Sequence, residues 1–222
     1  MRISRLFCCA FLLASPAAAE QAPKPIPMPS SDEARHAGDS EIAVLAGGCY
    51  WGMQAIFERV HGVKAVTAGF SGAPASGEDQ LIHSSSGTPA EAVRIEFDPA
   101  QLTYGQILQI YFSVAHDPTQ VDRQGPDVGP QYRSAIYFDN NDQKRIAENY
   151  IAQLQSAGVF PAPIATQVVP LTGFHRVMSS QQDYVRKNPT LPYVLGVDMP
   201  RIAALKRIYP GIYLDQPLTY SD

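Results

Sequence analysis

The sequence predicts an α/β (α+β) two-layer sandwich built on a mixed sheet. Three observations support this prediction. Short β-prone runs alternate with segments whose apolar residues recur at helical spacing. Turns rich in glycine and proline separate these segments. The chain of 222 residues shows no internal repeat and is long enough for one domain with a substantial core.

The residues before this domain are expected to stand apart from it. Residues 1–19 begin with Arg2 and Arg5, continue with a short apolar run and end in three alanines. This pattern is typical of a secretory signal peptide and is too short for a mature anchor, so we expect an exported protein, periplasmic or secreted, with no membrane anchor. Residues 20–39 carry four prolines and few large apolar residues, which predicts a flexible tail. The domain is predicted over residues 40–222.

The predicted elements of the domain follow one another in a regular order. Apolar runs, some alternating with polar residues, predict strands over residues 41–46, 63–70, 92–97, 135–138 and 166–171. Apolar residues at helical spacing predict helices over residues 51–60, 103–114, 141–157, 179–187 and 201–208. We expect these elements to form a ferredoxin-like core with a mixed sheet. Two long loops, 71–87 and 117–133, are candidates for functional segments.

Charge and cysteine content argue against several classes of protein. The chain carries 17 basic and 21 acidic residues, a net charge of −4; loss of Arg2 and Arg5 with the signal gives 15 − 21 = −6. No basic surface for nucleic acid is therefore expected. No later run is long and apolar enough to cross a membrane. Once the signal is removed, Cys49 is the single cysteine, and one cysteine with scattered histidines matches no metal-site spacing.

The junction "GGCYWG" around Cys49 is the strongest candidate for a functional site. Cys49 falls where a strand ends and a helix begins, so the helix dipole is expected to lower the pKa of the thiol. The glycines allow a tight turn, and Tyr50 and Trp51 place aromatic rings beside the sulfur. The alternative is that these residues fill the core, since free cysteine is often buried. A single mature cysteine between glycines and a helix favours chemistry.

Longer segments of the sequence resemble a known family. "GGCYWG", "AEAVRIEFDP", "YGQILQIYFSVAHDPTQ" and "RQGPDVGPQYRSAIYF" are similar to segments of the A-type peptide methionine sulfoxide reductases. The similarity extends from about Glu41 to Tyr213. It implies a monomeric enzyme that reduces methionine (S)-sulfoxide, free or in proteins, to methionine through a cysteine sulfenic acid. Tyr50, where the family has phenylalanine, and Trp51 would form the substrate-binding cage around the S-methyl group.

The resemblance also implies catalytic roles for four residues. Cys49 would be the nucleophile, and Glu91 the acid that protonates the sulfoxide oxygen, with a pKa raised by burial. The Tyr132 phenol would donate a hydrogen bond to that oxygen. Asp127 would orient Cys49 or a water molecule. Without the resemblance, Glu91 would be interpreted as a surface residue at a strand start, and Asp127 as a loop residue that forms a turn.

A second nucleophilic arrangement can be drawn from His116. A cysteine and a histidine together suggest a Cys–His dyad of an acyl-transfer enzyme. Nothing in the sequence places His116 near Cys49, so we expect His116 to brace the loop that follows it.

Three departures from the family pattern bear on activity. The segment before Glu91 is "SGTPAE", where the family usually has "TGHAE", and a tyrosine expected about a dozen residues earlier has no counterpart. In "RVMSSQQDY", Met178 and Gln181 replace a glutamate and a histidine. These changes leave a second function open, a weakened or inactive module that binds methionine sulfoxide without turnover.

The position of Cys49 as the last cysteine of the sequence bears on how its thiol would be regenerated. Many family members carry C-terminal cysteines that attack the sulfenic acid, whereas this chain has none after Cys49. We therefore expect no bound cofactor and an external thiol reductant, either a small thiol or a thioredoxin- or glutaredoxin-like protein.

Overall fold

The structure, a computed structural model, describes residues 21–72 and 88–221 of the chain. The predicted signal peptide, residues 1–19, lies outside the described residues. Most of the predicted loop 71–87 lies outside them as well.

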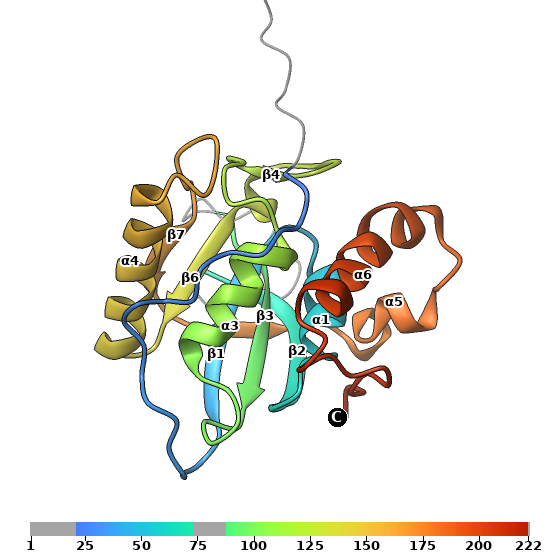
Figure 1. The fold of residues 1–222 in the computed structure, drawn as a ribbon. Helices are drawn as coiled ribbons and strands as arrows, with labels where there is room; N and C mark the ends of the chain where they lie inside the picture. Colours follow the sequence, from blue (N-terminus) through green and yellow to red (C-terminus); the bar gives the residue numbers. More distant parts are fainter. Residues whose placement is uncertain (1–20, 73–87, 222) are drawn as a thin grey trace, which may run out of the picture.

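A six-stranded mixed sheet organises the molecule, with strand order β7-β6-β1-β3-β2-β8 (Figure 1). Its strands are β1 (Glu41–Gly47), β2 (Val63–Ser71), β3 (Ala90–Phe97), β6 (Ser134–Phe138), β7 (Gln167–Pro170) and β8 (Phe174–Arg176). β1 runs antiparallel to both β3 and β6, and β2 runs antiparallel to β3 and β8. Only β7 is parallel to its neighbour, β6. The predicted α/β fold with a mixed sheet is confirmed.

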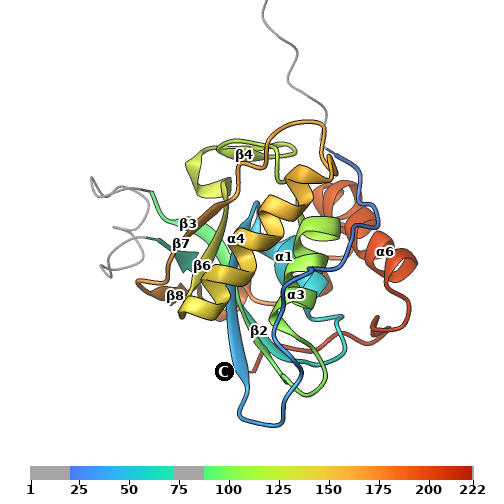
Figure 2. The same cartoon turned by 60° about the vertical axis from the view of Figure 1, so that its left-hand side comes forward.

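Helices separate some of these strands along the chain and also follow the last strand. They are α1 (Tyr50–Phe57), α3 (Tyr104–Ile110), α4 (Asn141–Ser156), α5 (Tyr184–Lys187) and α6 (Met199–Ile208). Two π-helical segments adjoin them, η1 (Tyr111–Ala115) after α3 and η4 (Val194–Asp198) before α6. The predicted loop 117–133 contains a short hairpin of β4 (Arg123–Gln124) and β5 (Asp127–Val128), followed by a 3-10 turn, η2 (Pro130–Tyr132). Figure 2 shows α3 and α4 side by side over the sheet.

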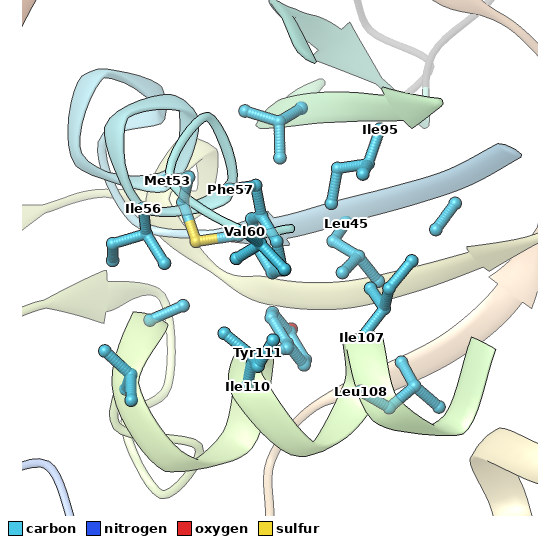
Figure 3. Close-up of a cluster of buried hydrophobic side chains, with 14 of the residues drawn as sticks. Leu45, Met53, Ile56, Phe57, Val60, Ile95, Ile107, Leu108, Ile110 and Tyr111 are labelled. Carbon is cyan, nitrogen blue, oxygen red and sulfur yellow. The ribbon is translucent and has the colours of Figure 1, made fainter. Parts of the chain in front are cut away.

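Both faces of the sheet are covered at β1, where successive side chains are buried on opposite sides. Ala43 and Leu45 face the main core with the helices, while Val44 and Ala46 face a smaller cluster on the opposite side. In Figure 3, Leu45 lies among apolar side chains of α1 and α3. Burying a side chain of this size stabilises the fold by about 1.5–3 kcal/mol. This burial anchors the carboxyl end of β1, next to the point where α1 begins.

The predicted helix over residues 179–187 is divided into two parts in the structure. Ser179–Gln181 forms a 3-10 turn, and α5 begins only after Asp183, whose φ of +52° interrupts the helix. Gln182 causes the break, because its side chain bonds the amide and carbonyl of Ala68 in β2, both at 2.9 Å. The segment is thereby tied to the edge of the sheet, where β8 also pairs.

The segment 21–39, predicted to be a flexible tail, instead follows a defined path across α3 and α4 (Figure 2). Ile26 is buried in the core, and its carbonyl accepts a hydrogen bond from Gln109 of α3. The Pro27 carbonyl accepts one from Tyr150 of α4. An extended proline-rich chain makes no internal hydrogen bonds, so its carbonyls remain available to neighbouring side chains. Sequence composition did not reveal these acceptors.

This segment also caps the start of α3. Asp32 accepts hydrogen bonds from the Gly105 amide at 2.9 Å and from the Thr103 hydroxyl at 2.5 Å. Asp32→Ala is expected to lower the free energy of unfolding by about 1–2 kcal/mol, since a capping acceptor at a helix N-terminus is lost. Urea denaturation measures the change. Asp39→Ala, at an exposed position, is the control, and equal stability of the two variants would contradict the capping role.

Candidate active site

Cys49 lies at the turn that joins the central strand to α1. It is the N-cap residue of α1, with φ −58° and ψ 125°, and its exposed fraction is 9%. Gly48 before it has φ +98°, and a β-carbon there would lie 2.6 Å from side-chain atoms of Gln124. The turn therefore requires glycine at this position. The expected strand–turn–helix position of the cysteine is observed.

The environment of Cys49 has the opposite effect on its pKa from the one the sequence indicated. Burial, followed by the charge of Glu91, raises the pKa of the Cys49 thiol well above its usual value. A hydrogen bond from the Trp51 amide at the helix start lowers it, but burial outweighs that contribution. The predicted depression of the thiol pKa by the helix N-terminus is wrong. The sulfur of the resting protein is a thiol that must lose its proton to react.

Glu91 provides an acceptor for that proton. It lies near the start of β3, where its Oε2 accepts a hydrogen bond from the Tyr50 amide at 3.0 Å. Burial raises the pKa of Glu91 to about 7, in the direction expected from the sequence, and the neighbouring Cys49 side chain opposes this rise. The charge of Glu91 in turn raises the pKa of Cys49. The two groups are therefore close enough to interact, and the carboxylate can take the thiol proton.

Two tyrosines and Asp127 complete the polar side of the site. Tyr132, at the end of η2, has its pKa raised to about 12 by burial and by the charge of Glu91, so its phenol remains a donor. The Tyr193 hydroxyl donates a hydrogen bond to Asp127 of β5. Asp127 thus orients Tyr193, and the role that the sequence suggested for it, orienting Cys49 or a water molecule, stays a prediction. Burial also raises the pKa of Tyr193, which keeps this hydroxyl protonated.

Aromatic rings form the apolar side of the site. The Trp51 ring stacks on Tyr184 with centroids 3.7 Å apart, and Tyr193 meets it edge-on at 6.0 Å. Tyr50 lies 5.8 Å from the ring of Phe70 and 6.2 Å from that of Trp51. The predicted pair Tyr50 and Trp51 therefore belongs to a larger aromatic cluster. Sequence reasoning missed Phe70, Tyr184 and Tyr193, because no motif joins them to Cys49.

Gln181 gains a role in this cluster. Its Oε1 accepts a hydrogen bond from the Trp51 indole nitrogen at 3.2 Å. The sequence marked Gln181 as a departure that could weaken the pocket wall. In the structure it fixes the Trp51 ring, while Met178, the other marked departure, is exposed.

A cavity of about 330 Å³ adjoins these groups. Its walls include the carboxyl-bearing Glu91, the phenol of Tyr132 and the ring of Phe70. The remaining lining residues are Thr88, Pro89, Pro130 and Gln131. Two larger cavities exist, but neither has Glu91 in its walls, and Cys49 lines none of the three. The cavity beside Glu91 therefore suits a small ligand with one polar oxygen.

His116 takes no part in this arrangement. It is buried, and burial lowers its pKa to about 3. Its Nδ1 lies 3.0 Å from the Tyr111 carbonyl oxygen, and its Nε2 lies 3.4 Å from the Thr166 hydroxyl. Both ring nitrogens thus face partners other than Cys49. This geometry supports the bracing role and argues against a Cys–His dyad.

Within residues 21–72 and 88–221, His, Cys, Asp and Glu form no group of three or more suited to a metal ion. None of the helices described there has the length and apolar character needed to cross a membrane.

This α/β fold buries one thiol beside a carboxyl that can carry a proton, and aromatic rings and phenols surround both groups. The combination defines a cysteine-dependent enzyme. The family model described as "Peptide methionine sulfoxide reductase" matches residues 41–209. The chain belongs to the peptide methionine sulfoxide reductase family.

Individual relatives agree with this assignment. "Peptide methionine sulfoxide reductase MsrA 2" of Mesorhizobium japonicum is 44% identical over 81% of this chain and 92% of its own length. "Peptide methionine sulfoxide reductase MsrA" of Thermus thermophilus is 39% identical over 78% and 97%. The solved "Methionine sulfoxide reductase A of Corynebacterium diphtheriae" is 31% identical, covering 76% of this chain and 86% of that one, with a TM-score of 0.57.

Proposed function

We propose that this enzyme reduces the S epimer of methionine sulfoxide, free or within proteins, with Cys49 as the nucleophile. The pairing of the buried Cys49 side chain with the buried Glu91 carboxyl, which lines a cavity together with Tyr132, is the observation that carries the proposal. One buried pair thus contains both a nucleophile and an acid.

The reaction follows from the positions of these groups. The Cys49 proton moves to Glu91, and the resulting thiolate attacks the sulfoxide sulfur. Glu91 passes the proton to the sulfoxide oxygen, while Tyr132 and Tyr193 are the phenols that can donate to it. The attack forms a bond between the Cys49 sulfur and the substrate sulfur. The protonated oxygen then transfers to the Cys49 sulfur as this S–S bond and the substrate S–O bond break, so methionine leaves as the reduced thioether and Cys49 is left as a sulfenic acid. One sulfoxide and one thiol thus become one thioether and one sulfenic acid.

Regeneration is assigned to an external thiol, with no bound cofactor. A first thiol attacks the sulfenic acid, which releases water and leaves a mixed disulfide on Cys49. A second thiol attacks the donor sulfur of the mixed disulfide. This releases Cys49 as a thiol and joins the two donor thiols in a disulfide. The absence of any cysteine after Cys49 supports a donor outside the chain, a small thiol or a thioredoxin- or glutaredoxin-like protein.

A further proposal concerns where the enzyme acts. The signal-like residues 1–19 support export to a periplasm or the exterior, followed by action as a monomer.

The order of the strands supports a ferredoxin-like core. The chain follows the connectivity β1-α1-β2-β3-α3-β6, and these strands lie in the spatial order β6-β1-β3-β2.

A single-turnover assay without any added thiol tests the function. Purified protein is mixed with dabsyl-methionine sulfoxide of defined epimer, and the methionine product is quantified. We expect one methionine per chain from the S epimer and none from the R epimer. Binding of the S epimer without product would instead select the inactive binding module.

Trp51 is expected to contribute mainly to substrate binding. Trp51→Ala removes the ring that stacks on Tyr184 and should raise KM about tenfold or more, with a smaller change in kcat. Steady-state kinetics with a small thiol donor separate the two constants. Trp51→Phe retains an aromatic face and should stay within about threefold of the parent KM. Equal KM values for the parent and Trp51→Ala would exclude this role.

A further inference from the structure

Asp198 is a buried carboxyl that the reaction above does not use. It ends η4 and precedes α6, and its exposed fraction is 1%. Neither of its carboxyl oxygens has a hydrogen-bond partner among the residues that the structure describes. A buried carboxyl without hydrogen bonds is costly, so its position calls for a functional explanation.

The local geometry directs this carboxyl to the helix that begins at Cys49. Asp198 is the N-cap residue of α6, yet its side chain makes no capping hydrogen bond, and Pro200 occupies the first turn of α6. The side chain lies instead against Gly52, in the first turn of α1. A β-carbon at residue 52 would overlap Oδ1 of Asp198. Only glycine at this position leaves room for the carboxyl.

Four charged or titratable groups interact with Asp198. Arg201 of α6 attracts its charge, and Asp127 of β5 repels it. Cys49 at the start of α1 and Tyr193 also feel the charge of Asp198. Burial, opposed by Arg201, raises the pKa of Asp198 to about 7, so the carboxyl gains its charge near neutral pH. Asp198 does not line the cavity beside Glu91.

We propose that Asp198 is a positioning residue for Cys49, whose buried charge at the first turn of α1 keeps the sulfur of the resting enzyme protonated. This assignment rests on the proposed role of Cys49. A carboxylate disfavours a nearby thiolate, so the thiol keeps its proton until Glu91 accepts it when substrate is present. Protection matters here because peroxide attacks thiolates, and the chain has no later cysteine to capture a sulfenic acid before further oxidation.

Alkylation of Cys49 without substrate tests this role. Iodoacetamide labelling rates, quantified by mass spectrometry on the peptide that contains Cys49, are measured from pH 6 to pH 9 in the full chain. Asp198→Asn keeps the shape of the side chain and removes its charge. We expect equal rates for parent and variant near pH 6, where Asp198 is neutral. Above pH 8 the variant should react about three to ten times faster, since one pKa unit of the thiol corresponds to a tenfold change in thiolate.

The shape of this difference distinguishes charge from structure. A variant that reacts faster by the same factor at every pH has merely opened the pocket, and that result would overturn the proposal, as would equal rates throughout. Asp215→Asn removes a carboxyl that is 75% exposed, and should leave the profile unchanged. Asp198→Ser repeats the test if Asp198→Asn does not fold. Should Cys49 of the parent titrate below the value of free cysteine, about 8.5, the proposal fails whatever the variants show.

The two proposals fail separately. Alkylation needs no sulfoxide, so the labelling profile can be interpreted even if no methionine is formed in the single-turnover assay. Conversely, reduction of the S epimer with identical labelling of parent and variant would remove only the role of Asp198.

Discussion

Replacing Cys49 with serine is expected to abolish methionine formation from the S epimer in a single turnover. The parent should release one methionine per chain, and the variant should be slower by more than about 1000-fold, as when other enzymes lose their nucleophile. A hydroxyl is a far weaker nucleophile than a thiolate and holds its proton too tightly for Glu91 to remove it. Chromatographic quantification of methionine checks this result.

Two controls make the Cys49→Ser result specific. Cys8 and Cys9 lie in the predicted signal peptide, so in the full chain the double variant Cys8→Ser/Cys9→Ser leaves Cys49 as the one thiol and should retain full single turnover. The Cys49→Ser protein should keep its melting temperature within a few degrees, because the exchange replaces one small side chain with another. Methionine released by Cys49→Ser at the parent rate would eliminate Cys49 as the nucleophile.

Replacing Glu91 with glutamine has the second largest expected effect. The amide keeps an acceptor for the Tyr50 amide but can neither take the thiol proton nor pass it to the sulfoxide oxygen. The rate of the chemical step should fall about 100- to 10,000-fold, the usual contribution of general acid–base catalysis, while substrate binding changes little. Rapid-quench kinetics give the rate, and equilibrium binding of the sulfoxide gives the affinity.

The pH dependence provides a sharper test of the Glu91 role. The reactive form holds one proton on the Cys49–Glu91 pair, with the thiolate and the carboxylic acid side by side. With a Glu91 pKa of about 7 and a higher Cys49 pKa, the single-proton state forms as the pH rises through about 7. The parent rate should therefore rise through pH 7 and level off. In Glu91→Gln the plateau should vanish, and the rate should keep rising about tenfold per pH unit with ionisation of the thiol.

Glu96→Gln on the same strand is the matched control. Glu96 pairs with the Arg94 side chain at 3.5 Å, and both groups are partly exposed, so its loss should alter neither rate nor pH profile. If Glu91→Gln kept the parent rate, the acid would have to be a group other than Glu91.

Much of the fold could be predicted because its strands and helices carry local signals. The alternation in "AVRIEF" and the amphipathic pattern of residues 141–157 mark elements that the structure places within two residues of the prediction. Elements without such signals were missed or altered. β8 has three residues and exists because it pairs with β2, and Gln182 divides a predicted helix by bonding to Ala68. These interactions join positions more than 100 residues apart, which no local pattern encodes.

The thiol, the turn that carries it and the family to which Glu91, Asp127 and Tyr132 are matched all follow from the order of the residues. The charge state of the site follows from folding, because the pKa of a group depends on burial and on charges brought close in the folded chain. Cys49 shows this most clearly. The helix start that should have lowered its pKa is present, but burial, Glu91 and Asp198 raise it. The sequence shows which groups the chain contains. The distances between these groups and their exposure to solvent are set only when the chain folds.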